Sequence, residues 1–167
     1  MLSWDEAYRL ARTLAQKIID SGYKPDIIIG IGRGGLVPGR MICDFLLQND
    51  LTSIRTEHWG VASKREKARI KFSLPQEADI YGKKVLVVDD VADTGDSFSI
   101  IMDYLKEKNP LEIRTSVLQY KTCSTVTPDY WGEKLKDWNW IIYPWAFYED
   151  LAGFVQEILE KPATVEY

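Results

Sequence analysis

The order of apolar and polar positions along the chain predicts helices and buried strands that follow one another. Apolar residues recur at helical spacing after an S-x-x-E capping box at Ser3 and Glu6, which predicts a first helix over about residues 3–21. Short, mainly apolar runs at about residues 26–31 and 85–88 are typical of strands that are buried on both faces, as in a parallel sheet.

The same patterns predict further helices that carry Val37, Phe98 and Leu151, and further strands over residues 51–59 and 112–120. Because strands and helices alternate in a chain of 167 residues, we predict a single α/β domain.

Two segments depart from this alternation. Residues 60–82 are polar and mixed, and the alternation of Ala68, Ile70 and Phe72 within them predicts a hairpin. Residues 122–137 have no clear periodicity, so we expect irregular structure there.

Composition narrows the classes of protein that fit. The formal net charge of −4 and the pI of about 5.1 argue against general binding to nucleic acid, which requires a basic face. No apolar run approaches the roughly 20 residues that span a bilayer, and the polar N-terminus does not resemble a signal peptide. Cys43 and Cys123 are isolated, so we expect reduced thiols in a cytoplasmic protein.

The richest chemistry follows the strand at residues 85–88. Asp89 and Asp90 come where that strand should end, and the polar loop at residues 93–97 then opens a helix. Ligands of open α/β sheets bind at the carboxyl ends of strands, and backbone N–H groups at a helix start hold phosphate. The residues therefore fit a site for a cation or sugar hydroxyls beside a phosphate, although a solvated acidic turn and an ordinary helix start would also fit.

A glycine-rich loop follows the strand at residues 26–31. Gly30, Gly32 and Gly35 match the G-x-G-x-x-G pattern of dinucleotide-binding proteins, and Glu57 would then be the acid that binds the ribose. Under this alternative the protein is an NAD-type oxidoreductase, and the acidic stretch after residue 88 has no role. Arg33 inside the loop is better suited to a pyrophosphate group.

A third set of residues suits a planar heterocycle. Trp140 or Trp138 would stack on such a ring, although clustered tryptophans are more often part of a core. Lys121, at the end of a predicted strand, donates hydrogen bonds and accepts none, so a 6-oxopurine suits it better than adenine.

Residues 84–98 closely resemble the signature with which type I phosphoribosyltransferases bind phosphoribosyl pyrophosphate (PRPP). The run Arg33–Gly39 resembles the pyrophosphate loop of the xanthine-guanine members, and the Tyr-Pro-Trp segment at residues 143–145 resembles a hypoxanthine-guanine member. The resemblance implies their fold, which is α/β with a doubly wound, mostly parallel sheet, flanking helices and a small C-terminal hood at about residues 122–150. It also implies a lid loop at about residues 59–82, which contains a basic cluster.

The resemblance further implies a purine salvage enzyme that joins hypoxanthine, guanine or xanthine to PRPP with the help of Mg²⁺, and that assembles as a homodimer or homotetramer. A non-proline cis peptide would fall between Gly32 and Arg33. The implied site comprises Asp93 as the catalytic acid–base group; Asp89 and Asp90 for the ribose and, through water, for Mg²⁺; Asp93, Thr94, Gly95, Asp96 and Ser97 for the 5′-phosphate; Gly32, Arg33 and Gly34 for pyrophosphate; and Lys121, Trp140 and Ile141 for the base.

Several points stay open. Ile142 and Ala146 stand where the resembled enzymes have acidic residues, which leaves the base preference undecided, and Glu149 or Asp150 would have to supply a missing contact to base or metal. The role of His58, the single histidine, is equally undetermined. A PRPP- or nucleotide-sensing regulatory protein on the same fold is the alternative function.

Overall fold

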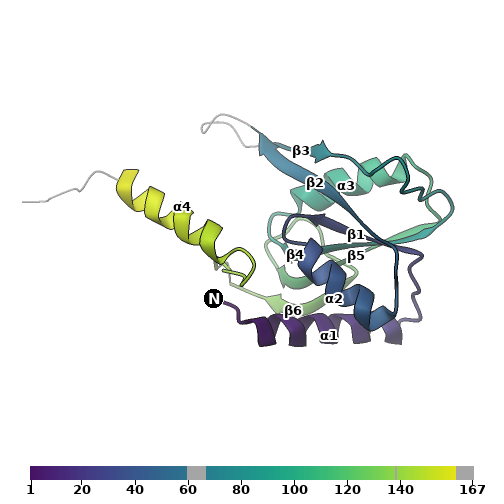
Figure 1. Cartoon of the computed structure of the whole chain (residues 1–167), viewed down its shortest axis with the longest axis horizontal. Coiled ribbons are helices and arrows are strands. Elements are labelled where there is room, and N and C mark those ends of the chain that lie inside the picture. The colour runs from purple at the N-terminus through teal and green to yellow at the C-terminus, as the bar shows by residue number, and fades with distance from the viewer. Residues whose placement is uncertain (60–66, 138, 161–167) are drawn as a thin grey trace, which may run out of the picture.

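The computed structural model describes residues 1–59, 67–137 and 139–160. Its six-stranded sheet has the order β3-β2-β1-β4-β5-β6, and every neighbouring pair is parallel except β2 and β3. Helices flank the sheet on both faces (Figure 1). The elements are α1 (Trp4–Asp20), β1 (Ile27–Gly32), α2 (Leu36–Leu46), β2 (Leu51–Trp59), β3 (Lys67–Phe72), β4 (Lys84–Ala92), α3 (Asp96–Lys106), β5 (Glu112–Lys121), β6 (Tyr130–Leu135) and α4 (Phe147–Glu160).

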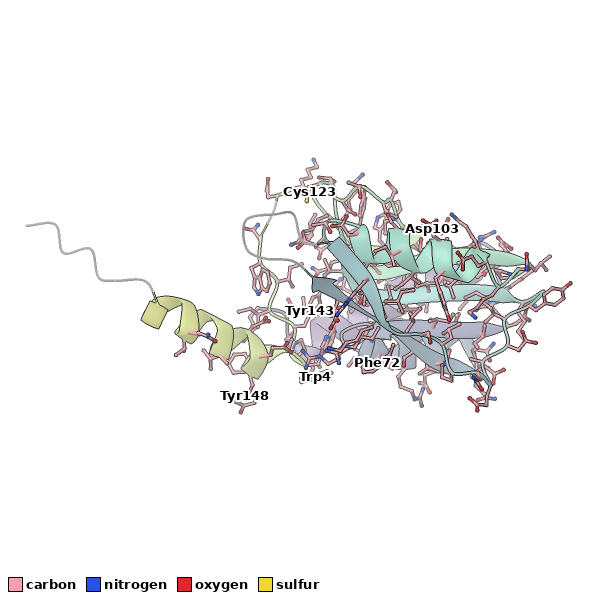
Figure 2. All side chains as sticks on the ribbon, turned by 90° about the horizontal axis from the view of Figure 1, so that it is seen from above. Trp4, Phe72, Asp103, Cys123, Tyr143 and Tyr148 are labelled. Carbon is pink, nitrogen blue, oxygen red and sulfur yellow. The ribbon has the colours of Figure 1, made fainter. Side chains whose placement is uncertain are left out.

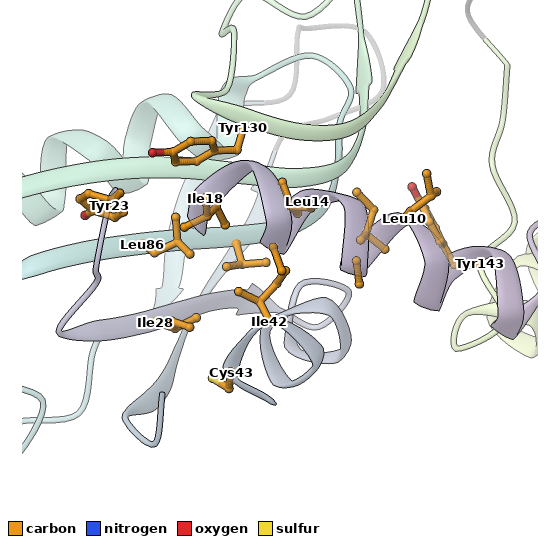
Figure 3. Packing of buried hydrophobic residues seen from close by; sticks show 14 residues of the cluster. Leu10, Leu14, Ile18, Tyr23, Ile28, Ile42, Cys43, Leu86, Tyr130 and Tyr143 are labelled. Carbon is orange, nitrogen blue, oxygen red and sulfur yellow. The ribbon is translucent and has the colours of Figure 1, made fainter. Parts of the chain in front are cut away.

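Each face of the sheet has its own hydrophobic core. On one face α1 and α2 cover alternate residues of β1, β4 and β5, with Leu14, Ile18, Ile28, Ile42 and Leu86 among the buried side chains (Figure 3). On the other face α3 covers the intervening residues, including Ile29, Val87 and Phe98. Consecutive residues of β1 and β4 therefore enter opposite cores, which explains why these strands are apolar throughout. The predicted doubly wound α/β fold is confirmed.

The start of α1 is set locally. The Ser3 side chain accepts a hydrogen bond from the Glu6 amide at 3.2 Å, and the Glu6 carboxylate accepts one from the Ser3 amide at 2.9 Å. This reciprocal pair is the capping box that the sequence predicts.

The prediction of irregular structure over residues 122–137 is wrong, because residues 130–135 form β6 along the edge of the sheet. Tyr130 is buried and Trp131 is partly buried, whereas Glu133 and Lys134 are adjacent and both exposed, so the strand lacks the alternation that marks a strand in sequence. Gly132 lies so close to α1 and β5 that a β-carbon there would be 2.7 Å from the carbonyl oxygen of Leu118. The expected hood is therefore limited to the segments on either side of β6.

The expected lid range also contains part of the sheet. The alternation at residues 68–72 does mark a strand, β3, but its partner is β2 and not another segment of the lid. Leu74 and Ile80, farther along, are buried in the core beneath α3. Residues 60–66 lie outside the described structure, so closure of a lid stays a prediction.

The last helix, α4, extends away from the body of the domain, with Tyr148 on its surface (Figures 1 and 2). The helix predicted around Leu151 is thereby confirmed. Leu151 and Val155 are 47% and 48% exposed, so their apolar side chains are not packed into either core. Among the described residues, no helix is both long and apolar enough to cross a membrane.

We expect Gly132→Ala to destabilise the protein, because its methyl group would overlap the Leu118 carbonyl and the backbone of α1. The cost should be roughly 1–3 kcal/mol, measured as a loss in the free energy of unfolding by urea denaturation. Gly153→Ala in α4 is the matched control, since a β-carbon there meets nothing within 4 Å. Equal stability of the two variants would contradict the close packing of β6 on α1.

Candidate active site

A cleft of about 580 Å³ opens at the carboxyl ends of the parallel strands. The register of these strands brings their ends to one edge, since Gly32 pairs with Arg55 and Asp89 pairs with Val117. The segment between β6 and α4 closes one side of the cleft. Of the residues that the sequence predicts for the site, the lining includes Gly32, Arg33, Gly34, Asp89, Asp90, Asp93, Ser97, Lys121, Trp140 and Ile141.

The two acids after residue 88 belong to the sheet. They had been expected beyond the strand end, but β4 continues to Ala92 because its pairing with β5 extends through Asp89 and Val91. Their backbone is therefore held by the sheet, and the Asp90 amide donates to the Asp89 carboxylate at 2.9 Å. Burial raises the pKa of Asp89 well above its usual range, and the neighbouring Asp90 charge raises it further. Burial likewise raises the pKa of Asp90.

Two hydrogen bonds and one close backbone contact fix the position of Asp90. The Trp145 indole N–H donates to its carboxylate at 3.1 Å, and the Tyr143 hydroxyl donates to its backbone carbonyl at 3.1 Å. A β-carbon on Gly34 would be only 2.1 Å from the same carboxylate, so only glycine lets the loop after β1 approach this acid.

Tyr143 and Trp145 stack at 4.9 Å, and burial raises the pKa of Tyr143, which keeps its hydroxyl protonated as a donor. The resemblance implies that Trp145 belongs to the segment that contacts the purine, but it gives Tyr143 no role. The Tyr-Pro-Trp segment carried no signal that it would reach Asp90.

The loop after β1 has the predicted cis peptide between Gly32 and Arg33. Gly35 packs so tightly that a β-carbon would lie 2.4 Å from the Val88 carbonyl, so this glycine joins the loop to β4. The Arg33 side chain forms an ion pair with Glu149 at the start of α4, and both side chains are largely exposed. In this structure Glu149 therefore contacts the loop expected to bind pyrophosphate.

The predicted 5′-phosphate loop leads into α3 as expected. Gly95 has a φ of +92°, and a β-carbon on it would meet the Val126 amide nitrogen at 2.8 Å, so glycine is required for both conformation and space. Asp96 is exposed at the first position of the helix. Of this loop, Asp93 and Ser97 line the cleft, whereas Thr94, Gly95 and Asp96 do not.

Asp93, in the loop after β4, contacts Lys121, the last residue of β5. The Lys121 ammonium lies 3.2 Å from an Asp93 carboxylate oxygen, and the lysine side chain is 3% exposed, against 34% for the aspartate. Trp140 lines the same cleft and is 57% exposed. Trp138, the alternative stacking residue, lies outside the described residues.

The acid required by the dinucleotide alternative has another role. Glu57 on β2 forms ion pairs with Arg69 and Lys71 on β3, each at 2.6 Å, and these hydrogen bonds lower its pKa. Through these contacts Glu57 links β2 to β3. The oxidoreductase hypothesis therefore loses the acid that would bind the ribose.

Solved structures with this fold include two close matches. The purine phosphoribosyltransferase from Pyrococcus horikoshii is 33% identical, with a TM-score of 0.76 over 86% of this chain and 91% of that one. A hypothetical protein from Neisseria gonorrhoeae with bound ppGpp is 27% identical, with a TM-score of 0.76 over 95% and 96% of the two chains. The fold and the site thus define a protein of the phosphoribosyltransferase class.

Sequence comparison makes the family explicit. Residues 1–150 match the phosphoribosyl transferase domain family, and the chain belongs to that family. It is 28% identical to the xanthine-guanine phosphoribosyltransferase of Idiomarina loihiensis, over 91% of this chain and 92% of that one. It is 32% identical to the hypoxanthine-guanine phosphoribosyltransferase of Saccharomyces cerevisiae over 56% of this chain, which is 48% of the yeast protein's length. The predicted family is confirmed.

We expect Asp89→Asn to stabilise the protein without ligand by about 1–2 kcal/mol, because it removes one of two buried like charges. A carboxyl whose pKa is raised by folding stabilises the native state at low pH, and that contribution is lost as pH rises from about 4 through the raised value. The advantage of the variant should therefore grow over this range, as thermal unfolding at several pH values would reveal. Asp44→Asn, an exposed control on α2, should give no such dependence.

Proposed function

We propose that the protein is a purine phosphoribosyltransferase that joins a 6-oxopurine to PRPP and releases pyrophosphate. The observation that carries this proposal is the Lys121–Asp93 pair beside Asp89 and Asp90 in a single cleft. A buried ammonium suits the 6-oxygen of hypoxanthine, guanine or xanthine, and the neighbouring acids suit a ribose ring that becomes positively charged in the transition state.

Asp93 is suited to the proton that leaves the purine. Its carboxylate contacts Lys121, which would hold the base, and its backbone begins the loop before α3, which would hold the 5′-phosphate. As the bond from N9 to the ribose forms, the N7 side of the ring becomes acidic and its proton would pass to Asp93. Trp140, an exposed aromatic side chain in the lining of the cleft, would stack on the purine, with Ile141 beside it.

Asp89 and Asp90 are suited to Mg²⁺ and the ribose hydroxyls. They supply carboxylate oxygens, which Mg²⁺ prefers, and their mutual repulsion would be relieved by a cation. Among the described residues no cluster of three or more acidic, histidine or cysteine side chains is placed to hold a metal ion. Asp89 and Asp90 would hold the ion, and the ion would supply positive charge to offset the negative charge of the pyrophosphate.

The proposal predicts that the protein releases pyrophosphate when PRPP, Mg²⁺ and a 6-oxopurine are supplied together. The assay compares hypoxanthine, guanine and xanthine with adenine and a pyrimidine base. Release should be fastest with one of the 6-oxopurines, because Lys121 offers donors only. No release with any base would overturn the enzymatic proposal.

We expect Asp93→Asn to lower turnover by about 10²–10⁴-fold, since it removes the proton acceptor. Binding of PRPP, followed by titration calorimetry, should change little, because the proposed contacts to PRPP come mainly from other residues. Asp103→Asn makes the same chemical change on the exposed surface of α3 and serves as the control. Wild-type turnover in the Asp93 variant would exclude this residue from the reaction.

The alternative function is a regulatory protein that senses PRPP or a nucleotide. It is favoured by one observation, the similar Neisseria gonorrhoeae structure with bound ppGpp. Tight binding of a guanine nucleotide, together with no pyrophosphate release from any base, would support this second function over the first.

A further inference from the structure

Charge in the cleft is unevenly distributed. In the described part of its lining, six carboxylates face three cationic side chains, Arg33, Arg55 and Lys121. PRPP carries a phosphate and a diphosphate. Cationic groups must therefore compensate for the negative charge of the carboxylates in the cleft before this anionic ligand can bind. Binding of PRPP therefore depends on which of the three cationic side chains already pair with a carboxylate of the protein.

Two of the three cations already have carboxylate partners within the cleft. Lys121 contacts Asp93, and Arg33 contacts Glu149. For Arg55, no carboxylate of the described residues lies within ion-pair distance. Its guanidinium carbon lies 5.9 Å from the centre of the Phe72 ring on β3, which is labelled in Figure 2. Arg55 is thus a partly buried cation, packed near an aromatic ring, whose hydrogen-bonding groups remain available.

The sheet places Arg55 beside the loop after β1. Gly32 and Arg55 are register partners in parallel strands, so their side-chain positions lie on the same face. A β-carbon on Gly32 would lie 3.6 Å from the β-carbon of Arg55 and 3.9 Å from its γ-carbon, which shows that the stem of the arginine passes directly alongside this glycine. Arg55 therefore enters the cleft next to the cis peptide that leads to Arg33.

The next residue of β2 points to the opposite face. The Thr56 hydroxyl lies 3.0 Å from the Ser97 hydroxyl at the start of α3. The end of β2 thus contacts both loops of the site, with Thr56 at the loop before α3 and Arg55 at the loop after β1. This arrangement separates Arg55 from the expected 5′-phosphate position.

We infer that Arg55 is a second pyrophosphate-binding residue, which with Arg33 holds the diphosphate group of PRPP and of the released product. This inference rests on the proposed function, since it assigns a residue to the ligand of the same cleft. A guanidinium presents a planar fork of donors that fits phosphate oxygens in pairs, whereas a lysine provides a point charge.

The test compares Arg55→Gln and Arg55→Lys with the wild-type protein. Binding of inorganic pyrophosphate with Mg²⁺, measured by titration calorimetry, should weaken about 10- to 100-fold in Arg55→Gln and by less in Arg55→Lys. Arg40→Gln removes the same charge from the exposed side of α2, outside the cleft, and should bind pyrophosphate as the wild type does.

Kinetics distinguish this assignment from a structural role. In the direction that consumes nucleoside monophosphate and pyrophosphate, the KM for pyrophosphate should rise in Arg55→Gln while the KM for the nucleotide stays within about two-fold of the wild-type value. An equal rise in both, with a lowered melting temperature, would overturn the inference in favour of a structural role. Unchanged pyrophosphate binding would also overturn it.

The calorimetric arm separates this inference from the proposed function. If the wild-type protein binds pyrophosphate but transfers no phosphoribosyl group to any base, the proposed function fails while the Arg55 assignment is still decided by the binding data. If the wild-type protein is an active enzyme and Arg55→Gln binds pyrophosphate normally, the Arg55 assignment alone fails.

Discussion

The repulsion between two neighbouring carboxylates at the end of a buried strand is the constraint on which the site depends. Asp89 and Asp90 are held by the pairing of β4 with β5, and their burial raises the pKa of both. Trp145 and Tyr143 hold Asp90 in one orientation, and the absence of a side chain at Gly34 brings the loop after β1 against it. The fold thus maintains an arrangement of like charges that is unfavourable alone, and that the proposed binding of a cation would make favourable.

The cations of the site come from elements distant in sequence and serve different parts of it. Lys121 ends β5 and is buried beside Asp93, whereas Arg33 lies in an exposed loop and contacts α4. Arg55 enters from β2, where Gly32 leaves room for its stem. Because only the parallel sheet brings the ends of β1, β2, β4 and β5 to one edge, the charge balance of the cleft is a property of the topology.

Local patterns in the sequence are sufficient to predict most of the helices and strands. The capping box at Ser3, the apolar runs of β1 and β4, and the helical spacing after Gly35 and Gly95 each depend on neighbouring residues, and each prediction is confirmed. The sequence does not reveal the strand β6, because this short edge strand has two adjacent aromatic residues followed by a glycine and two adjacent charged residues, and so does not alternate. The end of β4 was placed too early, because pairing with β5 extends a strand into residues whose own character suggests a turn.

The residue types at the strand ends and the positions of the glycines could be read from the sequence alone, because they are local features of the chain. The sequence also determined the family, whose signature lies within two short stretches. Only the tertiary structure decided which groups meet. Tyr143 and Trp145 reach Asp90 from more than 50 positions away, and Arg55 lies beside Gly32 through strand register. Such contacts depend on how separate elements pack, and no pattern along a single segment contains that information.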